Sequence, residues 1–432
     1  MRQTERVSEP AATRTLSAGS LAVVVGLGVF GASSFALLGL AGRDLGPAGS
    51  APVAVAWTAV NAVGLGLFVP VEQEVARLAS ARRPAGQPAP RLVHVLRYLA
   101  LASALVAVVA WLARGPLADT FFSGDRAMVG FTAAALVAVG LEYLVRGTLA
   151  GFGLFVRYGV QLTVDGLARV GLAALVYAAG WGSREAYAWA LVLAPLLAAA
   201  ATVSLAALRW LRDRPTDAGR ASLAPLVATT VASQLLGNAG PLAIAVLAGR
   251  TDPATTGSFV SVITVGRIPL FLYAAVQAVL LPTLSGLVAR GARAELLRTL
   301  RTTLLATTAV GVLGVAGIAV LGRWALHVVY GPAFTVAWLD LVLVAVSGAA
   351  YMLALATGHT LLAFRRDPLV LLGWVLGLLA TVACLALPLP VTTRVATALV
   401  VGSAASAASH GAVLTRVLRQ WAPGGGDERA DG

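Results

Sequence analysis

The stretch LFVPVEQEVARLASARR, residues 67–83, ends one long apolar run, and VLLPTLSGLVARGAR, residues 279–293, ends another. Pro70 and Pro282 lie 212 positions apart, close to half of the 432-residue chain, and arginines follow both prolines. The segments Arg114–Gly124 and Arg323–Gly331 echo each other in the same way, TFFSG in the first matching VVYGP in the second. An internal repeat of half the chain length predicts two similar halves.

The composition places both halves in a membrane. Hydrophobic residues make up 58% of the chain and charged residues 12%, with a mean hydropathy of +0.84. Soluble proteins have about 45–50% and about 25%. Since a spanning helix needs about 20 apolar residues, we expect an all-α polytopic membrane protein with about twelve transmembrane helices in two pseudo-symmetric six-helix bundles. The expected spans are residues 16–41, 50–70, 93–113, 127–146, 158–180, 186–208, 222–248, 257–285, 302–322, 336–358, 368–388 and 395–415.

Arginine placement predicts the orientation. The net charge is +13, and all 32 basic residues are arginine. With the N-terminus in the cytoplasm, 23 arginines fall on the inner side, 7 on the outer side and 2 within spans. Inner loops of membrane proteins carry an excess of basic residues. We therefore expect a multi-pass protein of the plasma (inner) membrane with both termini cytoplasmic, and no nucleic-acid partner.

The same pattern divides the chain into two bundles and three connecting or terminal segments. The tail after Trp421 is rich in glycine and charge, a composition typical of disorder. The expected parts are a cytoplasmic N-terminal tail at 1–15, an N-terminal bundle at 16–208, a cytoplasmic linker at 209–221, a C-terminal bundle at 222–418 and a disordered cytoplasmic tail at 419–432.

A stripe of polar residues runs along the expected helix 158–180. Arg157, Gln161, Asp165 and Arg169 are spaced four apart and therefore share one helix face. A charged side chain at a helix centre costs about 2.5–3.5 kcal/mol to insert, so the stripe must face protein or water. Two interpretations stay open: an ion pair between Asp165 and Arg169 that locks the bundle, or a cavity wall with net positive charge.

Arg267 is the corresponding charge in the second half. It stands two residues before Pro269, which removes a backbone hydrogen bond and favours a kink. We expect it either to face the same cavity as the stripe or to cap carbonyls of a neighbouring helix. Glu142 and Arg146, four apart, are expected to form an interfacial pair near the inner surface. Further polar candidates, more typical of contacts between helices than of ligand binding, are Gln234, Asn238 and Gln277.

Several function classes are disfavoured or excluded. Cys384 is the single cysteine, so an intramolecular disulfide is impossible, and four scattered histidines do not predict a metal site. A phosphate-binding loop needs a lysine, and the chain has none. Acidic residues stand singly in the outer loops, which argues against a membrane glycosyltransferase. We expect no enzyme activity and no cofactor, and the coupling ion, H⁺ or Na⁺, stays open.

Five segments resemble the multidrug/oligosaccharidyl-lipid/polysaccharide (MOP) exporter superfamily. The resemblance is greatest to its polysaccharide-transporter branch of Wzx-like flippases, and it extends over essentially the whole chain. The segments that carry it are VPVEQEVARL at 69–78, VRGTLAGFGLFVRYGVQL at 145–162, LLGNAGPLAIAVL at 235–247, GRIPLFLYAAVQAVLLPTLSGL at 266–287 and YGPAF at 330–334.

The resemblance implies alternating access between two lobes around a central cationic cavity. Its substrate would be an undecaprenyl-diphosphate-linked oligosaccharide for cell-surface polysaccharide biosynthesis, with glycosyltransferases or a polymerase of that pathway as partners. Arginine binds phosphate in bidentate fashion without losing its proton. Arg169 and Arg267 are therefore the first binding candidates, with Arg157 as a contact at the inner surface and Asp165 orienting Arg169.

Two alternatives remain open. One is a cation-coupled multidrug exporter of the same fold, although that branch usually needs carboxylates in the lobe cavities and the expected helix 16–41 has none. The other is a non-transporting membrane scaffold of envelope polymer assembly. Anionic side chains inside the membrane favour the drug exporter, and cationic ones favour the flippase.

Overall fold

The computed structural model describes residues 18–80, 92–204 and 223–421, which are helical with short connections and contain no strand. The expected tail 1–15 and linker 209–221, and most of the tail 419–432, lie outside these residues. The helices are α1 (Ala18–Ala59), η1 (Val60–Gly64), α2 (Leu65–Ser80), α3 (Val93–Leu112), α4 (Arg114–Phe121), α5 (Arg126–Gly151), α6 (Phe155–Ala178), α7 (Arg184–Thr202), α9 (Ala224–Gly237), α10 (Ala239–Ala248), α11 (Pro253–Gly266), α12 (Ile268–Ala289), α13 (Arg293–Tyr330), α14 (Trp338–Ala363), α15 (Asp367–Cys384) and α16 (Val391–Gln420).

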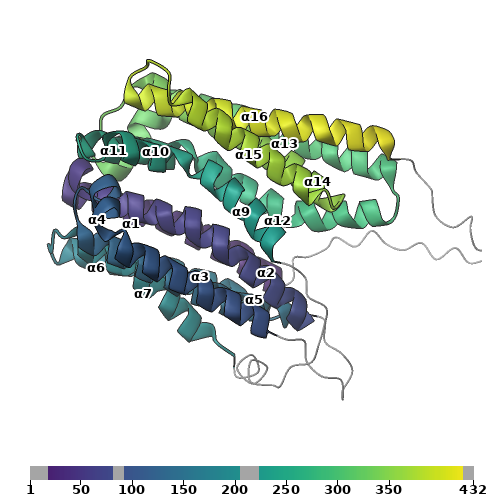
Figure 1. The fold of residues 1–432 in the computed structure, drawn as a ribbon, viewed down its shortest axis with the longest axis horizontal. Helices are drawn as coiled ribbons and strands as arrows, with labels where there is room; N and C mark the ends of the chain where they lie inside the picture. The colour runs from purple at the N-terminus through teal and green to yellow at the C-terminus, as the bar shows by residue number, and fades with distance from the viewer. Residues whose placement is uncertain (1–17, 81–91, 205–222, 422–432) are drawn as a thin grey trace, which may run out of the picture.

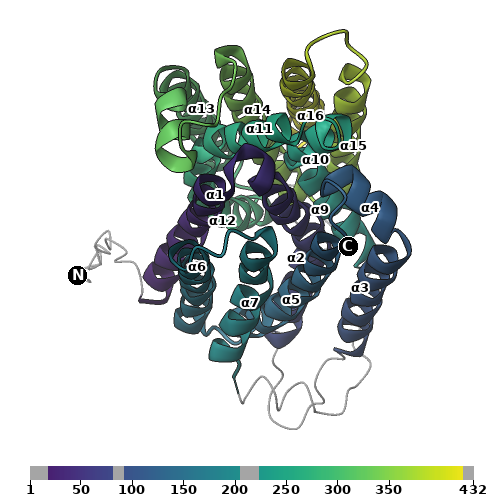
Figure 2. The ribbon, with the colours of Figure 1, turned by 90° about the vertical axis from the view of Figure 1, so that its left-hand side faces the viewer.

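The first two expected spans form one bent helical segment. α1 turns sharply at Gly46, which has φ 67° and ψ 180° and is followed by Pro47. Glycine takes positive φ without the steric cost that a side chain brings. The second arm continues through the π-helical turn η1 into α2, so the two arms meet at the bend (Figure 2).

Nine helical segments of the described residues are long and apolar enough to cross a membrane, or ten if the bent pair α9–α10 is one span. The segment Ala18–Ser80 counts once among the nine, but each of its arms exceeds the length of one crossing. With α11 and α12 as one further crossing, the described helices accommodate the twelve expected spans. Large apolar side chains on the outer faces, such as Trp111 (75% exposed) and Val320 (79% exposed), suit contact with lipid.

The expected spans 222–248 and 257–285 each consist of two helices; the sequence predicted a kink beside Pro269 in the second span and none in the first. The first breaks at Asn238, where α9 and α10 meet at 59°, and the second breaks at Arg267. Prolines explain both breaks: Pro241 and Pro269 carry no N–H, so each leaves a carbonyl one turn earlier without its helical donor. For Pro241 that carbonyl belongs to Gly237.

The segments expected as matching outer loops are also largely helical. Arg114–Phe121 forms α4, and Arg323–Tyr330 forms the end of α13. The chain leaves each of them through a glycine with positive φ, Gly124 at 85° and Gly331 at 100°.

The two halves pack their helices in the same pattern, which confirms the expected pair of six-helix bundles. In the N-lobe (α1–α7), α6 packs on α1 and α7, and α5 packs on α2, α3 and α7. In the C-lobe (α9–α16), α15 packs on α9 and α16, and α14 packs on α12, α13 and α16. Figure 1 shows the two lobes converging at the bend of α1 and diverging toward the opposite end.

Contacts between the lobes involve α1 with α11 and α13, α2 with α9, and α4 with α10. Near the bend the approach is close: a Cβ built on Gly257 would lie 1.9 Å from the Pro47 carbonyl oxygen. Arg43 of α1 donates from Nε to the Val329 carbonyl at 3.0 Å and from its Nη2 to the Val328 carbonyl at the end of α13. A cation at a helix C-terminus is favourable, so Arg43 ties the lobes together at this end.

The orientation is tested by labelling single cysteines. Thr251, in the exposed turn before α11, and Ala289, exposed at the end of α12, lie at opposite ends of one crossing. In a Cys384→Ser background, a membrane-impermeant maleimide is expected to label Thr251→Cys in intact cells. It should label Ala289→Cys only after the membrane is opened. The reverse result would invert the orientation that the arginines indicate.

Candidate functional site

A cavity of about 270 Å³ lies between the two lobes. One wall comes from α1, η1 and α2, and the other from α9–α12 and α14. Within the described residues, Arg267 is the only charged side chain in the lining, and no carboxylate reaches it. The polar lining residues are Ser34, Asn61, Gln234, Asn238, Thr264, Arg267 and Tyr351.

Arg267 stands at the break between α11 and α12, and one of its Nη atoms donates to the Gly237 carbonyl. That is the carbonyl left open by Pro241. The two interpretations of Arg267 therefore coexist, since the side chain lines the cavity and also caps a neighbouring helix. A guanidinium carries five N–H donors, more than one carbonyl can accept, so it can hold this contact and still bind an anion.

Gln234 and Asn238 lie next to Arg267 in the cavity wall. The Asn238 amide donates to the Gln234 carbonyl at 2.9 Å and to its side-chain oxygen at 3.4 Å. Both residues thus combine a contact within the broken helix with exposure to the cavity. The side chain of Gln277 lies outside the described residues.

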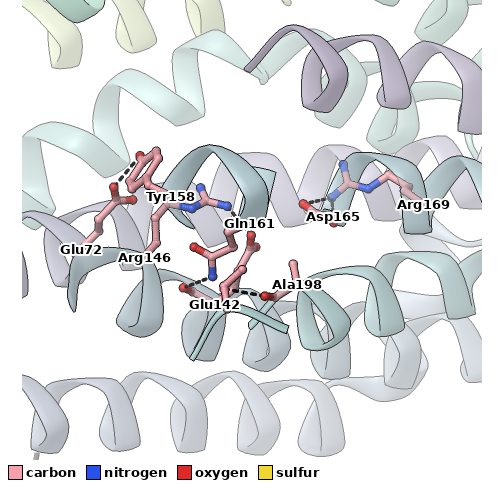
Figure 3. Close-up of polar contacts among 9 residues, drawn as sticks. Glu72, Glu142, Arg146, Tyr158, Gln161, Asp165, Arg169 and Ala198 are labelled. Carbon is pink, nitrogen blue, oxygen red and sulfur yellow. Dashed lines mark hydrogen bonds and ion pairs between the residues drawn. The ribbon is translucent and has the colours of Figure 1, made fainter. Parts of the chain in front are cut away.

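A second group of polar side chains, the N-lobe cluster, is buried between α5 and α6 (Figure 3). Arg169 donates from Nη2 to both carboxylate oxygens of Asp165, at 3.0 and 2.8 Å, and Arg146 pairs with Glu142. Gln161 donates to the Glu142 carbonyl at 3.4 Å.

The interpretation of Glu142 and Arg146 as an interfacial pair is wrong. Their exposed fractions are 2% and 4%, and the Arg146 guanidinium lies against the rings of Phe30 and Tyr158. Each neutralises the charge of the other, which offsets part of the cost of burying it. Arg157, by contrast, is exposed at the start of α6 and does not join the cluster.

The N-lobe cluster has two guanidiniums and three carboxylates, so it carries no excess of positive charge. Arg146 and Arg169 face Glu142 and Asp165, and Glu72 of α2 adds a third carboxylate that accepts a hydrogen bond of 2.8 Å from the Tyr158 hydroxyl. The guanidiniums also lie over aromatic rings: Arg169 is 4.9 Å from the Phe30 ring centroid and Arg146 is 4.6 Å from that of Tyr143. Cation–π contacts of this kind further stabilise each guanidinium in its position.

The N-lobe cluster is a neighbour of the central cavity. Asp165, Arg169 and Glu142 line a hollow of about 20 Å³ whose other walls include Trp57, Asn61 and Leu65. Those three residues also line the central cavity. Asn61 belongs to the π-helical turn η1, and such turns are frequent at functional sites. Among the described residues, no group of three or more His, Cys, Asp or Glu side chains could hold a metal ion.

Comparison with known proteins begins with sequence. No family model matches the chain. The uncharacterized protein Rv1510 of Mycobacterium tuberculosis is 29% identical over 406 residues, which cover 88% of each chain. The uncharacterized protein Rv3630 of the same organism is 26% identical over 427 residues, 95% of each chain. These relatives share the length of the chain and carry no description of function.

Solved structures share the fold. A Vibrio cholerae MATE transporter superposes with a TM-score of 0.66 and 16% identity, over 94% of this chain and 97% of that one. A Pyrococcus furiosus transporter of the MOP superfamily, described as having a binding pocket of reverse polarity, gives 0.65 and 15% over 94% and 96%. An inward-facing MATE transporter gives 0.64 and 14% over 92% and 98%. The chain therefore has the fold of the MATE transporters.

Proposed function

We propose that this membrane protein is a transporter that carries a lipid-linked oligosaccharide across the membrane by alternating access. The substrate is a glycan on a polyprenyl diphosphate, used in cell-surface polysaccharide biosynthesis. The observation that carries this proposal is the cation in the central cavity: Arg267 lines it, and no carboxylate of the described residues does. The fold supports the transport step, since its two lobes enclose that cavity between them.

The chemistry of the cavity suits a diphosphate with a sugar attached. The diphosphate must leave water, and an arginine replaces hydration with charge-assisted hydrogen bonds. Gln234, Asn238 and Asn61 present amide groups that can donate to and accept from sugar hydroxyls. The apolar remainder of the lining, which includes Trp57 and Leu270, suits the faces of sugar rings and the first part of a lipid chain.

A multidrug exporter of cationic compounds fits the central cavity less well. A cationic drug would face Arg267 without a neutralising carboxylate, and like charges in a confined site repel each other. The Pyrococcus furiosus transporter, whose binding pocket is described as reversed in polarity and suggestive of a different function, supports such a departure within this fold. A scaffold without transport activity would need no polar cavity between its lobes.

The proposal includes a setting in the cell. We place the protein in the plasma membrane with both termini cytoplasmic, next to glycosyltransferases or a polymerase that make and consume the lipid-linked glycan. Substrate would reach Arg267 from the cytoplasmic leaflet, past the exposed Arg157 at the start of α6. The driving ion, H⁺ or Na⁺, is a separate question.

Translocation is measured with purified protein in liposomes. A fluorescent polyprenyl-diphosphate oligosaccharide is incorporated into both leaflets during reconstitution, and dithionite then bleaches the label that is in, or reaches, the outer leaflet. We expect bleaching of nearly all label in protein-containing liposomes and of about half in empty ones, because passive crossing of a diphosphate is slow. Ethidium, a cationic drug probe, should not be transported. Ethidium transport without lipid translocation would favour the drug exporter, and neither activity would favour the scaffold.

A further inference from the structure

His410 is a fully buried histidine in α16, and its ring contacts α14 and α15 of the C-lobe. Its Nδ1 lies 3.1 Å from the Ala354 carbonyl oxygen of α14, and its Nε2 lies 3.0 Å from the Val370 carbonyl oxygen of α15. A neutral imidazole has one N–H, whereas an imidazolium donates from both nitrogens. Both ring nitrogens face acceptors here, so the protonated ring is the form that satisfies the site.

The position of the ring is fixed by packing. A Cβ built on Gly373 of α15 would lie 2.3 Å from Nε2, and one on Gly358 of α14 would lie 3.4 Å from Nδ1. The Trp374 ring meets the imidazole edge to face, with 4.8 Å between centroids. The two glycines therefore open a slot in which the ring can reach both carbonyls. The packing of α14, α15 and α16 therefore sets both contacts, because the ring has little freedom to rotate in this slot.

The positive charge of a protonated His410 is stabilised without an ion pair. Among the described residues, no carboxylate oxygen lies within 4 Å of either ring nitrogen. The titratable groups nearby are His359 and Tyr351 on α14; α9 and α10 have none, and α15 has Asp367 in its first turn and Cys384 at its last residue. Burial opposes a charge, while two carbonyl dipoles favour it. The geometry therefore offers a second hydrogen bond only to the protonated ring.

Ring contacts join His410 to the central cavity. Trp374 packs on Tyr351, with 5.7 Å between ring centroids. Tyr351 lines the cavity, and its hydroxyl donates to the Ser233 carbonyl of α9 at 3.0 Å. A change in the spacing of α14, α15 and α16 would therefore move a wall of the cavity that also holds Arg267.

We propose that His410 is a proton-binding site of the C-lobe. When protonated, it donates to both carbonyls and ties α14 and α15 to α16. When the proton leaves to water, one of the two contacts becomes a lone pair facing a carbonyl oxygen, and the tie is lost on that side. Because Tyr351 lies on α14 and lines the cavity, a movement of α14 on proton binding changes the shape of the cavity. This last step rests on the proposed function, whereas proton binding itself does not.

The test is ¹⁵N NMR of protein labelled at histidine nitrogens in lipid nanodiscs, which requires no substrate. We expect the His410 ring to show two N–H nitrogens at low pH and one at high pH within about pH 5–9. The signal is assigned by its loss in His410→Gln. If that variant does not fold, it is assigned as the signal that remains after His94→Gln, His327→Gln and His359→Gln.

A ring that stays neutral, or stays doubly protonated, over the whole range would overturn the proposal. Thermal stability should change with pH through the titration of the wild type, since the two protonation states make different contacts with the two carbonyls. This change should vanish in His410→Gln and persist in His94→Gln, the control at the start of α3, where the ring contacts Glu74 of α2. Failure of glycan transport with a titrating His410 would count against the proposed function alone.

Discussion

Replacement of Arg267 by glutamine is expected to reduce translocation of the polyprenyl-diphosphate oligosaccharide by at least about a hundredfold. Two charge-assisted hydrogen bonds to phosphate are worth about 1.5–3 kcal/mol each, and about 1.4 kcal/mol corresponds to a factor of ten. Arg267→Lys should keep part of the activity, because it retains the charge and loses the planar fork. The measurement is the rate of label loss in proteoliposomes that contain equal amounts of each variant.

The control must separate binding from helix capping, because Arg267 also donates to the Gly237 carbonyl. Arg394 is the matched residue: it donates from Nε and Nη2 to the Leu389 carbonyl at 3.1 and 2.8 Å, at the start of α16 and outside the cavity lining. Arg394→Gln should cost a comparable amount of stability and leave translocation unchanged. Normal translocation by Arg267→Gln would remove Arg267 from substrate binding. If the Arg267→Gln and Arg394→Gln variants were lost from the membrane to the same extent, Arg267 would have only the role of capping the Gly237 carbonyl.

The helices could be predicted because each crossing needs a long apolar run, and the two-lobe arrangement could be predicted because Pro70 and Pro282 repeat at half the chain length. The breaks could not be placed as easily. Gly and Pro are common in transmembrane helices, so Pro241 gave no sign of a break, whereas Gly46 lay between two expected spans and Pro269 predicted a kink. Whether such a residue kinks or breaks a helix depends on which neighbouring group accepts or replaces the lost bond, as Arg267 does for Gly237.

Arg267 stood out in the sequence as a lone charge in an apolar run, and Asp165 and Arg169 stood out by their spacing. Contacts between distant segments gave no such signal. Glu72 meets Tyr158 across 86 positions, and Tyr351 reaches the cavity from α14. His410 lies in the last turns of the expected span 395–415. α16 continues to Gln420, which leaves His410 inside the lobe, where its ring contacts α14 and α15.

Neutralising Asp165 or Arg169 singly is expected to destabilise the protein strongly. Asp165 is fully buried and Arg169 is 7% exposed, and both bonds between them come from one Nη atom, with the Phe30 ring beneath. Removing one partner of a buried pair costs about 3–5 kcal/mol, because it strands the other charge. Asp165→Asn and Arg169→Gln should therefore each lower the thermal stability in detergent. The double variant should recover most of it.

Translocation by the double variant distinguishes the two roles left open for this pair. Since Asp165 neutralises Arg169 outside the central cavity lining, we expect a double variant that is stable and still moves the glycan. The matched control is Arg184→Gln, which breaks a partly exposed pair with Asp125 at 3.5 Å and should cost at most about 1 kcal/mol. A double variant that is as stable as the wild type but inactive would instead make Arg169 a binding residue. The small hollow shared with Trp57 and Asn61 would then be part of the substrate path, joined to the cavity that holds Arg267.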